Sequence, residues 1–401
     1  MNNSVYLDHN ATTPVDPRVL QKMLPFFTEN YANPSSASHI AGRRARDVVE
    51  RSRATIAAGI GAQPEEIVFT SGATEANNTV ICGVLNASCV PRGHIISVKT
   101  EHHAVLRPIA AMRERGHDYT LLSVAPHGRS DAGTINLNEF VAAIRPDTKL
   151  VSVMLGNNVI GTIQPLQQIS KICRERGILL HSDATQAVGK IPVDVQNLGL
   201  DFMSVSAHKM YGPKGVGALF IRNGRAKELM TPLIYGGRQE RGIRGGTLNV
   251  PGIVGLAEAL KISIDEMPSE RRRIKKLRDS FAKNIIAAFP GTEIVGPDLS
   301  CDEIRLPNNL NVLIPRIRSA ELMAELTDVC VSNGSACVSD STEPSHVLVF
   351  LELSNEEARS CIRFGFGRFN TDDELAYALN HLQSRVRLLQ EKQPAERLVV
   401  V

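Results

Sequence analysis

A lysine embedded in a polar turn is the strongest chemical feature of the sequence. Lys209 lies in the segment 204–215, where an apolar strand pattern ends and glycine and proline residues follow. Most lysines are solvated surface groups, but an amine held in such a turn can act as a nucleophile toward a carbonyl group. The turn alone leaves both interpretations open.

An acidic residue precedes this lysine at a suggestive spacing. Asp183 follows another apolar strand pattern and stands 209 − 183 = 26 residues before Lys209, which leaves room for one more strand. Pyridoxal phosphate needs a carboxylate to keep its pyridine nitrogen protonated and a lysine to hold its aldehyde. By itself, Asp183 would be interpreted as a helix N-cap.

A third segment has the composition of a phosphate site. Residues 70–75 follow a strand pattern and contain small residues and hydroxyl groups. Backbone N–H groups at the start of a helix, together with the helix dipole, bind phosphate. An ordinary capping box with Ser71 and Thr74 is the alternative. Beside the other two segments, however, the motif favours a cofactor with a phosphate group.

Alternating strand and helix patterns must position these groups. They predict a mostly parallel sheet covered by helices on both faces, with ligands at the carboxyl ends of the strands. From about residue 258 a charged helix, interpreted as solvated, leads into a smaller α+β domain that ends with a helix over 372–390. The expected strands are 66–70, 94–98, 118–122, 150–155, 178–181, 202–205 and 217–221, then 311–314, 329–332 and 359–364.

Composition argues against several classes of protein. The 45 basic and 42 acidic residues give a net charge of +3, too near neutral to indicate a nucleic-acid partner. Seven cysteines, an odd number without a C-x-x-C pair, indicate neither a disulfide framework nor a zinc site. We find no signal-peptide pattern and no apolar run of about 18 residues. A cytoplasmic protein that binds neither membranes nor nucleic acid is expected.

The three segments, in this order, resemble those of the cysteine desulfurases. These are NifS- and IscS-like members of the class V aminotransferase family, with the fold-type I architecture of pyridoxal-phosphate enzymes. The resemblance runs from about residue 5 to 385 and includes motifs at 6–14, 100–106, 244–247, 334–337, 343–348 and 362–369. It implies an α/β fold with a large cofactor-binding domain over 15–260. Residues 1–14 and 261–401 would form the small α+β domain, which carries a catalytic cysteine loop.

The resemblance also assigns roles to individual residues. Lys209 would hold pyridoxal 5'-phosphate and then move the substrate Cα proton, while Asp183 would pair with the pyridine nitrogen. His102 would stack on the ring and relay a proton, and Gln186 would donate to the phenolic oxygen. The phosphate would be bound by Ala73, Thr74, Ser206, His208 and, from the partner subunit of a homodimer, Thr247.

Two further residues are expected to bind the substrate. Arg363 can hold an amino-acid carboxylate with two parallel hydrogen bonds, and its place in an apolar strand argues against a surface ion pair. Asn158 would reach both the carboxylate and the cofactor. Val159 stands where the family commonly has Glu, so a charge beside the substrate pocket is missing.

Cys337 is the residue on which the predicted reaction depends. It lies in a segment of small polar residues, where a thiol is expected to be exposed and able to ionise. It would attack the sulfur of cofactor-bound L-cysteine, release L-alanine and carry a persulfide. No metal site is expected, although a transient role of Cys337 as an iron–sulfur ligand stays open. Cys361 should share a strand face with Arg363 and is favoured as a packing residue over an auxiliary thiol.

The sequence therefore predicts a homodimeric cysteine desulfurase that passes sulfur to a protein acceptor, such as an iron–sulfur scaffold. It leaves open whether the sulfur serves iron–sulfur assembly, tRNA thiolation or DNA modification. A selenocysteine lyase or an aminotransferase on the same fold is the alternative enzyme. A sulfur carrier or scaffold without catalysis is the alternative of another class.

Overall fold

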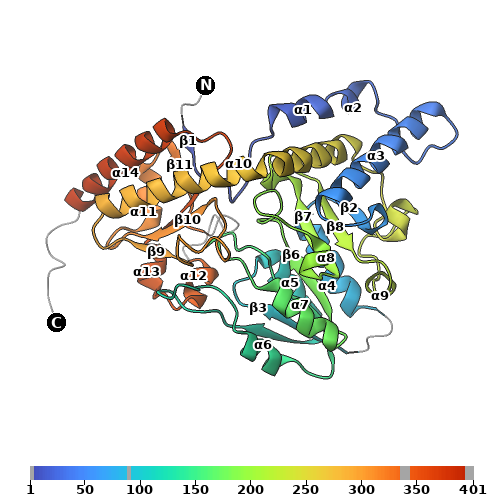
Figure 1. Ribbon diagram of the computed structural model, residues 1–401, viewed down its shortest axis with the longest axis horizontal. Coiled ribbons are helices and arrows are strands. Elements are labelled where there is room, and N and C mark those ends of the chain that lie inside the picture. Colours follow the sequence, from blue (N-terminus) through green and yellow to red (C-terminus); the bar gives the residue numbers. More distant parts are fainter. Residues whose placement is uncertain (1–3, 88–91, 335–343, 393–401) are drawn as a thin grey trace.

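A seven-stranded sheet dominates the computed structural model, which describes residues 4–87, 92–334 and 344–392 (Figure 1). Its strand order is β2-β8-β7-β6-β5-β3-β4, and β8 runs antiparallel to its two neighbours while the other neighbours pair in parallel. The predicted mostly parallel sheet is thus confirmed. The strands are β2 Ile67–Thr70, β3 His94–Val98, β4 Asp118–Leu122, β5 Thr148–Ser152, β6 Leu179–Asp183, β7 Phe202–Ser206 and β8 Gly217–Ile221.

Both faces of this sheet are buried, which explains the unbroken apolar runs of its strands. Successive residues of a strand enter two different cores: Leu179 packs on one face and Leu180 on the other. One core includes side chains of α4 and α5, and the other includes side chains of α3, α7 and α10. These helices span α3 Ile40–Gly59, α4 Ala73–Leu85, α5 His103–Glu114, α7 Leu166–Glu175 and α10 Val250–Ala288.

A second body packs around its own core, built from residues 5–7 and 277–386. It contains an antiparallel sheet of order β12-β10-β9 and a parallel pair of β1 with β11. Its strands and helices are β1 Val5–Tyr6, β9 Glu293–Val295, β10 Asn309–Leu313, β11 Val329–Cys330, β12 Cys361–Gly365, α11 Ser319–Glu325 and α14 Asp372–Lys392.

The long helix α10 connects the two bodies (Figure 1). Its first part packs in the core of the large sheet, and its last part packs in the second core. The domain boundary expected at residue 260 falls inside this continuous helix, and the division stays a prediction. The remaining helices are α1 Pro17–Met23, α2 Pro25–Thr28, α6 Leu137–Ala143, α8 Val195–Leu198, α9 Arg225–Glu228, α12 His346–Phe350 and α13 Asn355–Arg359, with 3-10 turns at Pro64–Glu66, Ala207–Lys209 and Gln239–Gly242.

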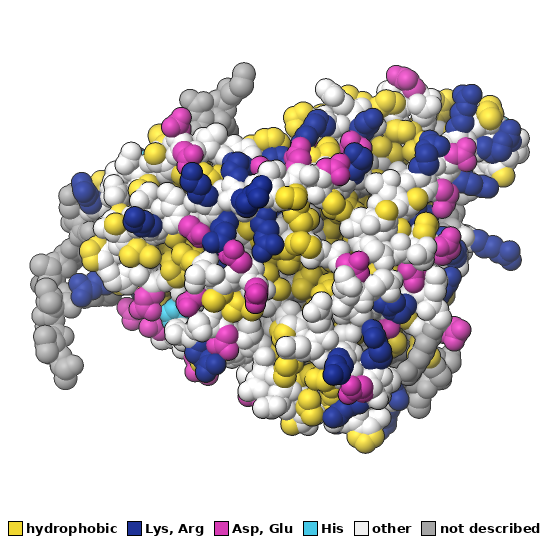
Figure 2. Space-filling view, in the orientation of Figure 1, with side chains coloured by type: hydrophobic (Ala, Val, Ile, Leu, Met, Phe, Trp, Pro, Cys, Tyr) yellow, Lys and Arg dark blue, Asp and Glu magenta, His cyan; other side chains and the backbone are white. Residues whose placement is uncertain are grey.

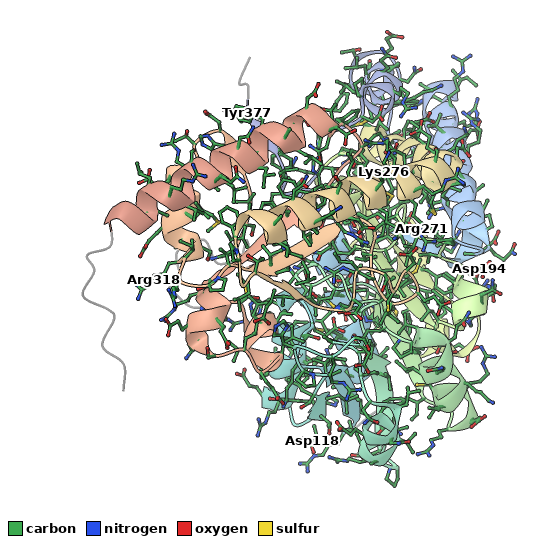
Figure 3. All side chains as sticks on the ribbon, turned by 60° about the vertical axis from the view of Figure 1, so that its left-hand side comes forward. Asp118, Asp194, Arg271, Lys276, Arg318 and Tyr377 are labelled. Carbon is green, nitrogen blue, oxygen red and sulfur yellow. The ribbon has the colours of Figure 1, made fainter. Side chains whose placement is uncertain are left out.

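The charged stretch of α10 is neutralised by acidic neighbours. Lys275 lies 3.1 Å from Asp279 and 3.3 Å from Asp302, so its charge is balanced locally. Figure 2 shows basic and acidic side chains interspersed over the face that carries α10 and α14, and Figure 3 locates Arg271 and Lys276 there. In the described part of the chain, every helix is too short or too polar to span a membrane.

Candidate active site

The loops that follow β2, β6 and β7 meet at one edge of the large sheet. Asp183 ends β6 and pairs in register with Ser204 of β7. A Cβ added to Gly72 would lie 3.5 Å from the Ser206 hydroxyl oxygen, and one added to Gly217 would lie 2.7 Å from the Cα of Gly72. Only glycine at 217 permits so close an approach of the backbones. The three predicted segments therefore meet at the carboxyl edge, as expected for this sheet.

The start of α4 has the form of a phosphate cradle. Its N-cap is Gly72, with φ of 150°, so no side chain caps the first turn and the predicted alternative of a capping box is not formed. The N–H groups of Ala73 and Thr74 therefore begin a 13-residue helix beside the Ser206 hydroxyl. Uncapped N–H groups at a helix start, next to a hydroxyl group, fit a phosphate.

An ion pair between Arg244 and Glu75 stabilises the start of α4. The Ser71 N–H donates to Glu75 Oε2 at 2.9 Å, and Arg244 Nε lies 3.0 Å from Glu75 Oε1. Thr247, the residue expected to complete the cradle of a partner subunit, lies three residues after Arg244 and is exposed. The segment that carries Thr247 is thus anchored to the first turn of α4.

Asp183 is buried, with 8% of its surface exposed, and is held by neutral donors. The Asn77 Nδ2 group donates to one carboxylate oxygen at 2.7 Å, and the Thr185 N–H donates to the other at 3.0 Å. His181, two residues earlier, bonds Ser152 and Ser204, and burial lowers its pKa to about 4, so it carries no charge. A buried carboxylate held in this way fits a protonated pyridine nitrogen.

Lys209 ends the 3-10 turn after β7 and points at the N-terminal segment. Its Nζ donates to the carbonyl oxygens of Asn10 at 2.7 Å and Ala11 at 2.5 Å. Gln186 Nε2 donates to the same Asn10 oxygen at 2.8 Å. The structure thus brings Lys209 and Gln186 together around one backbone carbonyl group.

His102 is oriented by the helix that it caps. The Ala104 N–H donates to His102 Nδ1 at 3.0 Å, so a neutral ring carries its proton on Nε2. His103 packs against His346 instead, with ring centroids 4.7 Å apart. His346 Nε2 donates to the Glu101 carbonyl oxygen at 2.9 Å, which holds the start of α12 against the loop of His102.

Glu101, beside His102, is fully buried. Its Oε1 accepts from the Met154 N–H, its Oε2 has no partner within the described residues, and burial raises the pKa of this carboxyl group well above its ordinary value. Protonation removes the charge that would otherwise stand near Asp183. Glu101 therefore adds no negative charge beside Asp183.

Arg363 is 1% exposed and already forms an ion pair. Its Nη2 lies 2.7 Å from Asp8 Oδ1, and its Nη1 donates to the Asn158 backbone oxygen at 3.1 Å. The expectation that it avoids the surface is therefore confirmed. The observed contact of Asn158 is its carbonyl group rather than its side chain. A guanidinium has five N–H groups, so Asp8 and Asn158 leave others for a substrate carboxylate.

The imidazole of His208 contacts the N-terminal segment. His208 Nδ1 lies 3.0 Å from Thr12 Oγ1, and burial with the neighbouring Lys209 charge lowers the pKa of His208 to about 4.

Cys337 lies outside the described residues. The segment that contains it starts after Gly334, where an added Cβ would lie 2.8 Å from Val159 Cγ1. Val159 is buried and packs against Gly334.

Cys361 is a packing residue. It is buried in the core of the large sheet, whereas its strand neighbours Ile362 and Phe364 belong to the second core, so Cys361 and Arg363 share a face as predicted. Its thiol contacts the Glu357 carbonyl oxygen at 3.3 Å, and burial raises its pKa to about 12. A thiol that stays protonated is a poor nucleophile.

Several residues that contact the site carried no predicted role. They come from the N-terminal segment and from helical turns that follow the predicted residues. A polar residue one helical turn from a predicted ligand could have signalled two of them, because Asn77 follows Ala73 by four and Lys190 follows Gln186 by four. The residues are Asp8, Asn10, Asn77, Glu101 and Lys190.

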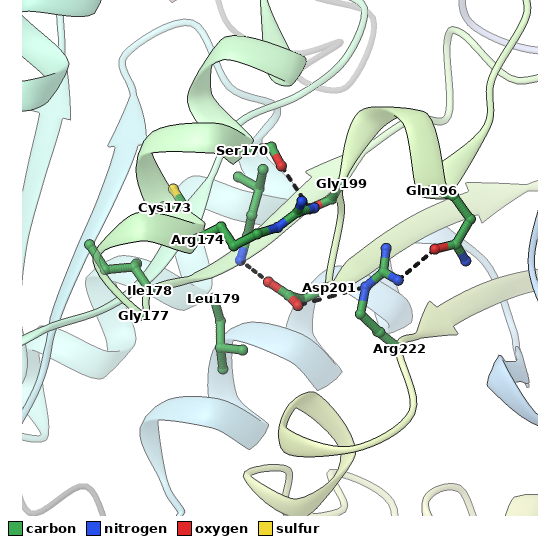
Figure 4. A pocket seen from close by; sticks show the side chains of 11 residues that line it. Ser170, Cys173, Arg174, Gly177, Ile178, Leu179, Gln196, Gly199, Asp201 and Arg222 are labelled. Carbon is green, nitrogen blue, oxygen red and sulfur yellow. Dashed lines mark hydrogen bonds and ion pairs between the residues drawn. The ribbon is translucent and has the colours of Figure 1, made fainter.

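A hollow at the opposite end of β6 has a different character (Figure 4). It measures about 470 Å³ and is lined by residues that include Leu179, at the start of β6, and Asp201. Arg222 donates to Gln196 Oε1 at 2.7 Å and to the Leu200 oxygen at 2.8 Å. No group of three metal-ligating side chains occurs among the described residues, in this hollow or elsewhere.

Comparison with known proteins places these features in context. The model of the aminotransferase class-V family matches residues 5–377. A cysteine desulfurase named IscS from Methylobacillus flagellatus is 45% identical over 392 residues, which cover 97% of this chain and 94% of that protein. The structure is similar to that of a NifS-like protein, with a TM-score of 0.87, 37% identity, and coverage of 96% of this chain and 100% of the other. It is also similar to SspA in complex with cysteine, with a TM-score of 0.79, 34% identity, and coverage of 92% and 100%.

Proposed function

The chain belongs to the class V aminotransferase family, and on this basis we propose that it is a cysteine desulfurase dependent on pyridoxal 5'-phosphate. It converts L-cysteine to L-alanine and transfers the sulfur to Cys337 as a persulfide. The observation that carries this proposal is the meeting of Asp183, Lys209 and the uncapped start of α4 at one sheet edge. The full-length similarity to IscS supports the choice of substrate.

The chain supplies a distinct group for each part of the cofactor. When bound, pyridoxal phosphate provides an electron sink for the α-carbon of an amino acid. Asp183 would hold the pyridine nitrogen, and the N–H groups of Ala73 and Thr74 would bind the phosphate together with Ser206 and His208. Lys209 would hold the aldehyde through its amine, which would later move the proton of the substrate Cα. His102 would stack on the ring and could donate its Nε2 proton, and Gln186 would donate to the phenolic oxygen.

Arg363 and Cys337 act on the substrate itself. The N–H groups of Arg363 that Asp8 and Asn158 leave available bind the substrate carboxylate. The Cys337 thiolate attacks the substrate sulfur, an S–S bond forms, and the C–S bond breaks. The released electron pair remains with the former Cβ, which is protonated to give L-alanine. No external oxidant or reductant is needed for this step.

A homodimer would complete the site through Thr247. Large apolar side chains are exposed in several of the described segments, including Tyr31 at 75% and Tyr235 at 80%. Exposed aromatic groups of this size are typical of interfaces. A protein thiol, such as that of an iron–sulfur scaffold, then accepts the persulfide sulfur, and we place the reaction in the cytoplasm.

Alanine formation tests this proposal. Purified protein loaded with pyridoxal phosphate should form one alanine for each sulfur released from L-cysteine in the presence of dithiothreitol. The Cys337→Ala variant should lose this activity by about 100-fold or more, because Cys337 is the thiol that is proposed to attack the substrate sulfur. The Cys301→Ala variant is the matched control and should remain active.

Two outcomes would overturn the assignment. Full alanine production by Cys337→Ala would rule out the persulfide step and favour a selenocysteine lyase, which would then prefer selenocysteine in competition. Pyruvate-dependent exchange of the amino group without sulfur release would identify an aminotransferase.

A further inference from the structure

Lys190 is an amine at the site that the proposed reaction does not use. It lies four residues after Gln186, in the turns that follow β6, and is largely withdrawn from solvent. Its Nζ lies 3.0 Å from the Gln186 backbone oxygen and 3.3 Å from Gln186 Oε1. The amine thus holds both the backbone and the side chain of a residue that is expected to contact the cofactor.

Gln186 connects this amine to Lys209. Its Nε2 donates to the Asn10 carbonyl oxygen at 2.8 Å, and the same oxygen accepts from Lys209 Nζ at 2.7 Å. The contacts therefore run from Lys190 through the Gln186 amide and the Asn10 carbonyl group to Lys209. A substitution of Lys190 should therefore alter the geometry beside the Lys209 amine.

The contacts also determine which way the Gln186 amide faces. In the observed orientation, Oε1 faces the Lys190 amine, and Nε2 faces the Asn10 carbonyl oxygen. A flipped amide would place an NH₂ group against an amine and an oxygen against a carbonyl oxygen, which loses both hydrogen bonds. The observed orientation leaves the second N–H of Nε2 for another acceptor.

We propose that Lys190 is a positioning residue of the active site, because its amine fixes the Gln186 amide as a donor to the cofactor's phenolic oxygen. The proposal rests on the proposed function, since it assumes that pyridoxal phosphate occupies the site. Lys190 itself does not hold the aldehyde and does not contact the substrate.

The electrostatic setting of Lys190 supports a functional reason for its presence. Burial, together with the charge of Lys209, lowers the pKa of Lys190 to about 7, and the same cluster includes the imidazoles of His9 and His208. Placing an amine among such groups opposes folding, and an apolar residue of similar length would avoid this cost. The amine is therefore better explained by the amide that it orients than by stability.

A double-mutant cycle tests the proposal. Wild type, Lys190→Met, Gln186→Leu and the double variant are loaded with pyridoxal phosphate, with Lys171→Met, an exposed lysine on α7, as the matched control. Two quantities are measured for each: the dissociation constant of the cofactor, and the pH midpoint of its visible absorption band. Neither depends on turnover, and a melting curve verifies that each variant is folded.

Loss of a donor to the phenolic oxygen leaves more electron density to hold the proton on the adjacent nitrogen contributed by Lys209. Lys190→Met should therefore raise the midpoint by about one pH unit and weaken cofactor binding by about tenfold. In the Gln186→Leu background the same substitution should change the dissociation constant by less than about twofold and the midpoint by less than about 0.3 pH unit, because Lys190 acts through Gln186.

Equal effects of Lys190→Met in both backgrounds would overturn the proposal, since Lys190 would then act directly by its charge. No effect in wild type would overturn it as well. If Lys190→Met is unfolded, Lys190→Leu replaces it, because a shorter apolar side chain also lacks a donor to Gln186 Oε1. Failure of the wild type to develop any visible band would contradict the proposed function instead, so the two failures are distinguishable.

Discussion

The two ends of strand β6 show what separates a binding site from a hollow. At its amino end, beside the hollow of about 470 Å³, Asp201 accepts from the Leu180 N–H at 2.8 Å, and Arg222 donates to Gln196 and to two backbone oxygens. At its carboxyl end, several buried polar atoms have no partner within the described residues. These atoms are in Asn10, Asn77, Glu101 and Thr185.

For ligand binding, the presence of polar atoms without partners matters more than the volume of the hollow. A hollow whose charged groups already bond the protein offers a ligand little beyond shape, whereas polar atoms without partners oppose folding until something binds them. At the two ends of β6, therefore, buried polar atoms without partners accompany the proposed chemistry, and satisfied charged groups accompany the hollow. The following substitutions challenge that contrast, from the largest expected effect to the smallest.

Lys209→Ala should abolish the reaction. Removal of the amine takes away both the attachment of the cofactor and the base, so activity should fall by about 1,000-fold or more, and the visible absorption band should disappear. Spectra and alanine assays measure the two effects. Retention of the band in Lys209→Ala, with Lys171→Ala as the control, would move the site away from this end of the sheet.

Arg363→Lys should affect binding of L-cysteine more than its conversion. Lysine keeps the charge but lacks the planar pair of donors, so KM should rise by about 10- to 100-fold with a smaller change in kcat. Steady-state kinetics separates the two constants. An unchanged KM would mean that Arg363 serves only its ion pair with Asp8.

Lys190→Met should change the pH dependence of stability. The pKa of Lys190 is about 7 in the folded chain, below its ordinary value of 10.5. Between these values the unfolded chain binds more protons, so this group makes the free energy of unfolding rise with pH across that window. Between pH 7 and pH 9.5, the free energy of urea unfolding should rise by about 3 kcal/mol less in Lys190→Met than in wild type. If the free energies of unfolding of wild type and Lys190→Met change with pH in the same way, the Lys190 amine is solvated.

Arg222→Gln should leave the reaction almost unchanged. It removes several hydrogen bonds at the amino end, so stability should fall by about 1–3 kcal/mol, while kcat/KM for L-cysteine should change by less than about twofold. Urea unfolding and kinetics on the same sample give both values. A large loss of activity in a folded protein would show that the amino-end hollow takes part in the function.

Much of the fold was predictable because the large sheet is buried on both faces. The strands predicted at 94–98, 118–122 and 217–221 coincide with β3, β4 and β8. β3 and β8 are buried along their whole length, which favours a largely apolar run, whereas β4 is an edge strand that is mostly half-buried. The strand predicted at 150–155 is observed at Thr148–Ser152, because the apolar run continues past the end of the strand into a buried loop.

Some site residues could be predicted from local sequence, whereas the contacts that hold them could not. Asp183 and Lys209 could be predicted because each comes directly after a strand of the parallel sheet, so local sequence indicates both the residue and its place. The contacts of Asp183 with Asn77 and of Arg363 with Asp8 join residues 106 and 355 positions apart, and no local pattern indicates such pairs. The contact of Lys190 with Gln186 is local, but the contact of Gln186 with Asn10 joins residues 176 positions apart and is not indicated by any local pattern.

The most direct test of the account is to locate the lysine that binds the cofactor. The full chain is incubated with pyridoxal phosphate, reduced with borohydride and digested, and the modified peptide is identified by mass spectrometry. We predict modification of Lys209 in stoichiometric yield, with Lys190 unmodified. Modification of Lys190 or of a lysine remote from the carboxyl edge, or no stable modification, would contradict the assignment of this edge as the active site.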